Sequence, residues 1–224
     1  KRRNMNMETA KGLQTSERFR IGALLAVAGG LLDAYTYLMR GGVFANAQTG
    51  NIVLLGVRAV EGDWSGVLHY LLPILAFAAG VIAAECIKER LKEARVVHWR
   101  QVTVCLEIIL LVLVAFLPQQ LDALANIMVS FVCAIQVESF RKVRGNAFAT
   151  TMCTGNLRSG TERLYQFIRT GEKDQLLRAA QYGGIILFFI GGAALGAWCS
   201  SFLSLCTVAV ACVPLLIAFL LMRH

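Results

Sequence analysis

Long apolar stretches, separated by short polar segments, dominate the sequence. The hydrocarbon core of a bilayer is about 30 Å thick and requires about 20 mostly apolar residues of helix. Six stretches approach or meet this length, at about 21–39, 66–86, 102–117, 122–138, 181–202 and 205–222. The pattern therefore predicts an all-α integral membrane protein with six transmembrane helices.

A shorter apolar segment, residues 51–60, follows the first predicted span. Its roughly 10 residues would form about 15 Å of helix, which is half of the bilayer core. If this segment crossed the membrane, the basic residues in 87–101 would face outward. We therefore expect it to enter the membrane and return, or to lie against the helical bundle.

The composition agrees with membrane insertion. Of the 224 residues, 57% are hydrophobic and 16% are charged, whereas soluble domains average about 25% charged residues. A water-soluble monomer of this composition would expose large apolar patches, so we do not expect a soluble enzyme, a disordered tail or a disulfide scaffold. The chain has no HExxH zinc helix and no glycine-rich phosphate loop, and its seven cysteines form no CxxC pair. We expect no enzymatic activity, no cofactor and no metal site.

Basic residues mark one side of the predicted membrane. All but two of the 22 Lys and Arg residues lie in four places: 1–20, 87–101, 139–180 and Arg223. If these places are cytoplasmic, the six spans alternate regularly and both termini are cytoplasmic, as the positive-inside rule requires. The net charge of +8 is then a signal for topology and for anionic lipid. We expect the lipid bilayer, and no nucleic acid, as the partner of these segments.

A short motif occurs twice in the chain. Thr49-Gly50-Asn51 recurs 105 residues later as Thr154-Gly155-Asn156. At the same offset, Asp33 of the first span corresponds to Glu138 of the fourth span. In both halves the triplet follows an acidic residue of a predicted span by the same distance. This combination indicates an internal repeat more strongly than the triplet alone.

The two halves share further features. Arg58 corresponds to Arg163 at the same offset, and Phe77-Ala-Ala-Gly80 resembles Phe188-Phe-Ile-Gly191. Each half has a span with an acid, a TGN turn, a short helix and two further spans. Because three spans are an odd number, the second half must enter the membrane from the opposite side, as in transporters with inverted-topology repeats. We predict one membrane domain with three parts: a cytoplasmic segment 1–20, a first repeat 21–118 and a second repeat 121–222.

The TGN triplets are typical of a helix start. Thr or Asn can cap exposed N–H groups, and Gly tolerates unusual dihedral angles. Two short helices that begin inside the membrane would offer free N–H donors and partial positive charge to a small anion or polar molecule near the midplane. The alternative is that Thr and Asn only cap short interfacial helices.

Asp33 and Glu138 are the two corresponding acids. An ionised carboxylate within a span is costly, so we expect the two to form a proton- or cation-binding pair. The alternative is a set of interfacial ion pairs, in which Asp33 pairs with Arg40 and Glu138 pairs with Arg141 or Lys142.

Other polar residues of the spans complete the candidate site. Gln136 could line a path or hold helices together, and Glu107 is expected to be a snorkelling or paired acid. Glycines at Gly29-Gly30, Gly80 and 192–196 permit close helix contacts, either within one chain or in a homodimer. The candidate substrate- or ion-binding residues are Asp33, Glu138, Thr49, Gly50, Asn51, Thr154, Gly155, Asn156, Gln136, Arg58 and Arg163.

Several pieces of the chain resemble a known family. The pieces are Gly30-Leu-Leu-Asp33-Ala-Tyr, Gly42-Val-Phe-Ala-Asn46, Thr49-Gly-Asn51 with Leu54-Leu-Gly56, and Thr154-Gly-Asn156-Leu. Together they resemble the YoaK-like family of bacterial inner-membrane proteins, DUF1275 or UPF0700, over about residues 20–222. The resemblance implies a multi-pass protein of the bacterial inner membrane, and it implies no activity and no site residues.

The sequence favours a secondary transporter or facilitator of a small polar or anionic solute, with Asp33 and Glu138 as proton- or ion-responsive groups. A channel built on the same two short helices is an alternative. A further alternative is a membrane scaffold or partner-binding protein that docks through the basic segment 139–180, for which Arg158, Arg163 and Arg169 would be essential.

Overall fold

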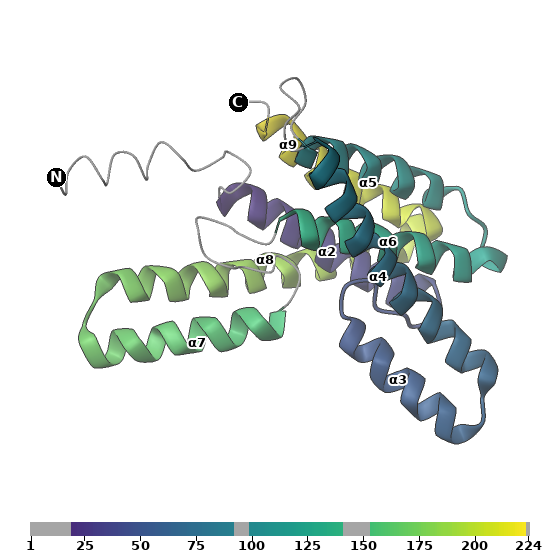
Figure 1. The fold of residues 1–224 in the computed structure, drawn as a ribbon, viewed down its shortest axis with the longest axis horizontal. Helices are drawn as coiled ribbons and strands as arrows, with labels where there is room; N and C mark the ends of the chain where they lie inside the picture. Colours follow the sequence, from purple (N-terminus) through teal and green to yellow (C-terminus); the bar gives the residue numbers. More distant parts are fainter. Residues whose placement is uncertain (1–18, 92–98, 141–152, 223–224) are drawn as a thin grey trace.

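The computed structural model describes residues 19–91, 99–140 and 153–222, and these contain helices and no strands (Figure 1). The helices are α2 (Phe19–Met39), α3 (Gln48–Glu61), α4 (Trp64–Leu91), α5 (Trp99–Ala115), η2 (Gln119–Leu121), α6 (Asp122–Ser139), α7 (Cys153–Thr170), α8 (Lys173–Leu203), η3 (Ser204–Ala211) and α9 (Cys212–Leu221). The all-α prediction is confirmed. The predicted cytoplasmic segment 1–20 lies almost entirely outside the described residues.

Four helical stretches of the described chain are long and apolar enough to cross a membrane. They are Phe19–Met39, Trp64–Leu91, Gln119–Ser139 and Lys173–Leu221. The last stretch contains 49 residues, and the chain turns within it at Ser204, which has a positive φ of 50°. These stretches make the chain a multi-pass membrane protein.

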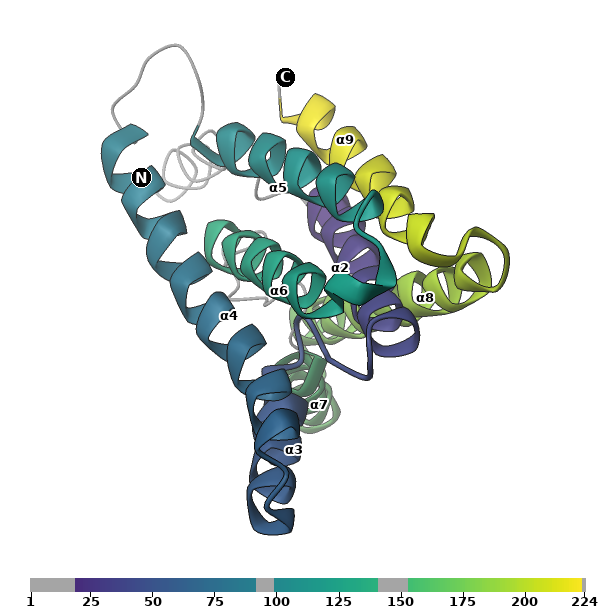
Figure 2. The ribbon, with the colours of Figure 1, turned by 90° about the vertical axis from the view of Figure 1, so that its right-hand side faces the viewer.

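The core of the molecule surrounds α2, which lies among α5, α6, α8 and α9 (Figure 2). α2 packs against α8, η3 and α9, whereas α6 packs against α4 and α5. Most residues of α2 are buried, which agrees with a helix that is apolar on every side. By contrast, α4 and α8 expose many large apolar side chains, among them Leu75, Ile82 and Leu187. In a membrane these side chains face lipid.

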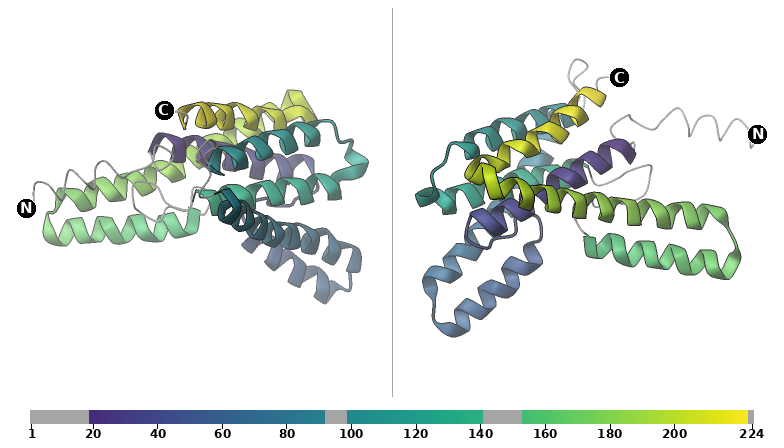
Figure 3. Two further views of the ribbon diagram at one scale, coloured as in Figure 1. Left: turned by 45° about the horizontal axis from the view of Figure 1, so that its top comes forward. Right: turned by 180° about the vertical axis from the view of Figure 1, so that it is seen from behind.

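Two helical hairpins project from this core in different directions (Figures 1 and 3). α3 folds back along α4, and α7 folds back along α8. The turn of the first hairpin uses Gly62, whose φ of 72° is left-handed and whose N–H bonds to carbonyl oxygens of the last turn of α3. The segment 51–60 therefore lies against α4, which is one of the two expected arrangements.

Close helix crossings explain two glycines of the helical body, Gly192 and Gly80. A Cβ added at Gly192 of α8 would collide with the backbone of Val27 in α2, and a Cβ added at Gly80 of α4 would collide with the backbone of Phe131 in α6. The predicted close contacts of these glycines thus form within one chain. The homodimer stays a prediction.

Candidate functional site

A cavity of about 660 Å³ lies where α3 and α7 begin. Binding sites for small molecules commonly measure about 300–1,000 Å³. The cavity is lined by Asp33, Ala34 and Tyr37 of α2, by Phe44 and residues 46–49, by Phe77 of α4, by residues 153–156, Arg158 and Ser159 of α7, and by Phe189 and Ala193 of α8. Both halves of the chain therefore contribute to one cavity.

The two TGN triplets occupy the same place in their helices. α3 begins at Gln48 and α7 begins at Cys153, so each helix starts one residue before its triplet. Thr49, Thr154 and Asn156 line the cavity, and both Asn51 and Asn156 are buried. The prediction that both triplets mark helix starts is confirmed.

The triplet of α3 does not cap the helix in the way predicted. Ala47 is the N-cap residue, and no side chain caps the helix. Instead, Asn51 binds the backbone of Phe44: its Oδ1 accepts from the Phe44 N–H at 3.0 Å, and its Nδ2 donates to the Phe44 carbonyl at 2.7 Å. Gly50 has no positive φ, and a Cβ there would lie 2.8 Å from the Phe44 ring. The triplet therefore fixes the connection that leads into α3 and leaves the first turn without a side-chain cap.

Asp33 of α2 also binds the connection between α2 and α3. Its side chain is buried in α2, and its Oδ1 accepts from the Asn46 N–H at 2.7 Å. The Asn46 side chain donates through Nδ2 to the Gly29 carbonyl at 3.1 Å. The Oδ1 of Asn46 is buried and has no hydrogen-bond partner within the described residues. Buried acceptors are normally paired, so this oxygen is an exception within the packed region beside the cavity.

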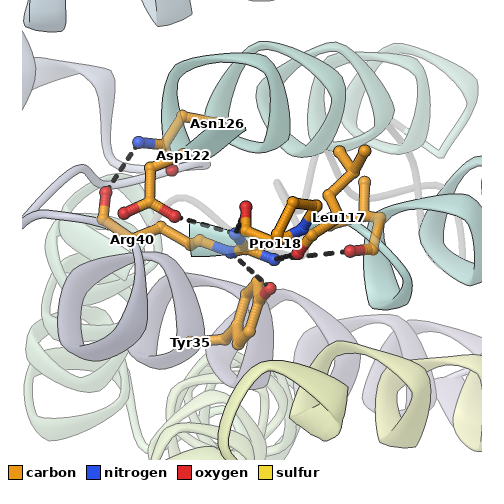
Figure 4. Close-up of polar contacts among 7 residues, drawn as sticks. Tyr35, Arg40, Leu117, Pro118, Asp122 and Asn126 are labelled. Atoms are coloured by element: carbon orange, nitrogen blue, oxygen red, sulfur yellow. Dashed lines mark hydrogen bonds and ion pairs between the residues drawn. The ribbon is translucent and has the colours of Figure 1, made fainter. Parts of the chain in front are cut away.

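Arg40 does not pair with Asp33, so that predicted ion pair is wrong. The side chain of Arg40 is fully buried, and its Nη1 lies 2.8 Å from Oδ1 of Asp122 (Figure 4). Its other hydrogen-bond acceptors are the Tyr35 hydroxyl and the carbonyl oxygens of Val114, Leu117 and Pro118. The Arg40 carbonyl in turn accepts from Nδ2 of Asn126 at 2.7 Å. Through these hydrogen bonds and this ion pair, Arg40 joins the end of α2 to the connection between α5 and α6.

Six predicted site residues lie outside the cavity lining: Gly50 and Asn51, which belong to the first triplet, and four residues elsewhere in the chain. Glu138 is half-buried near the end of α6, and its predicted partners Arg141 and Lys142 fall outside the described residues. Gln136 donates to the Leu25 carbonyl at 3.0 Å and so joins α6 to α2. The other two, Arg58 and Arg163, bind within the hairpins, to Glu61 and Gln175 respectively.

Sequence reasoning missed several residues that the structure brings to the cavity. Asn46 lies three residues before Thr49, and Arg158 lies four residues after Thr154 on the same face of α7. Arg158 has no ion-pair partner in the part of the chain that the structure describes. The cavity lining thus combines the carboxyl group of Asp33, the guanidinium group of Arg158 and the side chain of Asn46. Position relative to the triplet was the signal that could have identified both residues.

The cavity lining and the close helix crossings differ by one residue from the predicted repeat match. The sequence match placed Phe77 on Phe188, but Phe77 and Phe189 both line the cavity. Gly80 and Gly192 likewise occupy the close crossings. The repeat itself stays a prediction.

The chain belongs to the family described as "Protein of unknown function (DUF1275)", whose model matches residues 21–221. It is similar to the UPF0700 transmembrane protein YoaK of Bacillus subtilis (strain 168), with 29% identity over 182 residues that cover 75% of this chain and 78% of that protein. No solved structure gives a significant match. The family resemblance seen in the TGN-containing pieces is confirmed.

Proposed function

We propose that this member of the DUF1275 family is a secondary transporter of a small polar or anionic solute. The cavity between α3 and α7 is the proposed solute site. One observation carries the proposal: the two TGN helix starts and the buried Asp33 line the same cavity. Substrate sites of transporters with inverted repeats commonly lie at the repeat interface, where broken helices begin.

The packing supports an inverted repeat. In the proposed correspondence, α2 matches α6, α4 matches α8, and the hairpin of α3 and α4 matches that of α7 and α8. α2 of the first half packs against α8 of the second, and α6 of the second half packs against α4 of the first. Each of these crossings depends on a glycine that meets a carbonyl group, Gly192 or Gly80. A two-fold relation between residues 21–118 and 121–222 would produce this reciprocal packing.

Six spans follow from this correspondence. The 49-residue stretch Lys173–Leu221 would be about 74 Å long as one helix, more than twice the bilayer core. It therefore supplies two spans, α8 and η3 with α9, which meet at Ser204. α5 has 17 residues and is the shortest span. With the basic segments in the cytoplasm, both termini are cytoplasmic, and the protein lies in the inner membrane of a bacterium.

The cavity chemistry favours a solute with both donor and acceptor groups. Asp33 accepts hydrogen bonds, whereas Arg158 and the first turns of α3 and α7 attract negative charge. Phe44, Phe77 and Phe189 give the cavity apolar walls. A proton on Asp33 would weaken its bond to the Asn46 N–H and so loosen the connection into α3. Asp33 thereby links proton binding to the shape of the solute site.

Proton flux in proteoliposomes tests the proposal. Purified protein with an internal pH dye is challenged with lactate, alanine, putrescine and uracil, and D33N and R158Q proteins are measured beside wild type. The matched control is E162Q, which changes an exposed carboxylate of α7. We expect a saturable, solute-dependent pH change in wild type and E162Q that D33N abolishes.

Other outcomes favour the alternatives. A non-saturable flux that follows only the solute gradient would indicate a channel. Flux that survives in D33N and R158Q would contradict the assignment of the cavity as the solute site. The predicted pairing of Glu138 with Asp33 is tested in the same assay by E138Q.

A further inference from the structure

The hairpin of α7 and α8 carries an apolar groove along one of its faces. The groove has a volume of about 330 Å³, and none of the described residues that line it is charged. All of these residues belong to α7 and α8. The lining includes Leu157, Thr161 and Leu164 of α7 and Leu176, Ala180 and Gly183 of α8. We call this surface the groove face.

The residues of the groove face are spaced as in helices that pack against other helices. Along α7 the three named residues are separated by four and then three positions, and the three named residues of α8 have the same spacing. Alternating steps of three and four keep side chains on one side of a helix, which is the pattern of helical bundles. Ile168 continues the pattern on α7 and is 73% exposed, and Leu157 is 62% exposed. Each helix thus presents an apolar stripe without a partner helix among the described residues.

The hairpin extends away from the hydrocarbon core of the membrane. Eight charged residues lie between positions 158 and 178, whereas residues 179–203 of α8 contain none. α8 is one continuous helix (Figure 1), so its charged beginning continues the direction of its apolar part and does not lie flat on the lipid surface. α7 runs beside this charged beginning. The groove face is therefore exposed to water, where an apolar surface of this size marks a site of protein contact.

Two contacts determine which residues of α7 and α8 lie at the same level. A Cβ at Gly160 would lie 3.0 Å from Cβ of Tyr182, and Nη1 of Arg163 donates to Oε1 of Gln175 at 3.2 Å. Because the two helices are antiparallel (Figure 1), Leu164 is then level with Leu176, and Leu157 is level with Gly183.

This arrangement makes the groove face complementary to itself. All copies of a membrane protein have the same orientation in the membrane, so a two-fold axis between two copies runs along the hairpin. Such an axis places α7 of each copy on α8 of the other. Leu164 then meets the partner's Leu176, and Leu157 enters the space above the partner's Gly183. The product is a four-helix bundle with apolar stripes inside and charged residues outside.

The groove face is also large enough for a dimer. α7 has 18 residues, which corresponds to a length of about 27 Å. Two adjacent helices are roughly 20 Å wide, so two copies would together cover about 1,100 Å² of this face, and a specific interface requires about 1,000 Å².

We propose that the protein forms a homodimer through the groove face, with α7 of each copy packed against α8 of the other. The predicted homodimer thus forms through the hairpin and not through Gly80 and Gly192, whose close contacts lie within one chain. This proposal goes beyond the proposed function and does not depend on transport.

Single-molecule photobleaching in liposomes tests the proposal. Fluorescently labelled protein is counted at decreasing protein density as wild type, L164E, L176E and the matched control Q166E. Gln166 lies two positions after Leu164, about 200° further around α7, so Q166E adds the same charge outside the groove face. We expect two bleaching steps for wild type and Q166E, and a dimer dissociation constant raised at least about tenfold in L164E and L176E, because each buries an unpaired charge. A monomeric wild type, or a dimer that L164E leaves intact, overturns the proposal.

Cysteine cross-linking provides a second measurement without a charge in the groove. With Cys153 and the three exposed cysteines replaced by serine, G183C or Q166C is added and treated with a short bismaleimide. A Cβ at Gly183 would meet nothing within 4 Å, so we expect G183C to fold as wild type. We expect a covalent dimer of G183C and little or none of Q166C. Equal linking of the two variants, or linking of Q166C alone, contradicts the assigned interface.

Discussion

At the residue scale, buried polar side chains fix the connections that shape the cavity. Asn51 binds the backbone of Phe44, Asp33 binds the backbone of Asn46, and Arg40 binds carbonyl groups at the end of α5. Backbone groups outside regular helix must be paired when water is absent. These side chains therefore take the place of water as hydrogen-bond partners of the irregular backbone. Their hydrogen bonds maintain the shape of the cavity.

Removal of Arg40 tests how much its buried hydrogen bonds stabilise the fold. R40M leaves the carbonyl oxygens of Leu117 and Pro118 without their donor and separates Asp122 from its cation. We expect a loss of about 3–5 kcal/mol in the free energy of unfolding, measured by SDS titration in mixed micelles. The control R58Q, which breaks an exposed ion pair with Glu61, should cost about 0–1 kcal/mol. Equal stability of R40M and R58Q would contradict this role.

The Cys153 thiol reports the charge of Asp33. Burial, and secondly the negative charge of Asp33, raise the pKa of the Cys153 thiol above its ordinary value. The thiolate is the form that alkylating reagents attack, so the labelling rate should rise with pH and lie below that of the exposed Cys86. D33N removes the charge, lowers the pKa and should speed alkylation of Cys153 at a fixed pH. An unchanged rate would show that the Asp33 side chain is uncharged or shielded from Cys153.

At the element scale, two reciprocal helix crossings hold the halves together. α2 crosses α8 at Gly192, and α6 crosses α4 at Gly80. Apolar side chains gain little by association inside lipid, so close backbone packing supplies much of the attraction between helices. The small residues at these crossings therefore determine whether the two halves can interlock.

Neighbouring glycines of α8 allow a matched test. A Cβ at Gly192 would collide with the backbone of α2, whereas a Cβ at Gly191 would meet nothing within 4 Å. We expect G192A to destabilise the protein by roughly 1–3 kcal/mol. G191A should be neutral or stabilise by up to about 1 kcal/mol, because alanine favours helix. Similar unfolding curves for the two variants would show that α2 and α8 do not cross here.

The helices themselves could be predicted from the sequence because apolar runs and their polar ends are local. The predicted spans at 21–39 and 122–138 agree with α2 and α6 within two residues. The repeat of the TGN triplet likewise identified both helix starts at the cavity. The first short helix was predicted at 51–60, whereas α3 begins three residues earlier, at Gln48.

Partners distant in sequence could not be predicted. Arg40 was expected to pair with nearby Asp33, but it pairs with Asp122, 82 residues away. Position along a helix does not reveal which neighbouring helix meets that face, so the full burial of Glu107 and the inward position of Asn46 also escaped notice. For the same reason Glu138 was predicted to be a second binding acid of the solute site, although it does not line the cavity.

At the scale of the whole molecule, the central claim is that two reciprocal halves enclose one solute site. The two hairpins project from the core in different directions and begin at the same cavity (Figure 1). In the proposed carrier, rocking of the halves would expose this cavity to each side of the membrane in turn. A solute in the cavity must then contact Cys153, which lies in its wall.

Protection of Cys153 from alkylation tests this claim most directly. The exposed residues Cys86, Cys105 and Cys206 are replaced by serine, and labelling of Cys153 by N-ethylmaleimide is followed by mass spectrometry with lactate, alanine, putrescine or uracil present. We predict that the solute that drives proton flux also slows labelling of Cys153 in a saturable manner and that D33N weakens this protection. A transported solute that leaves the labelling rate of Cys153 unchanged would contradict the central claim.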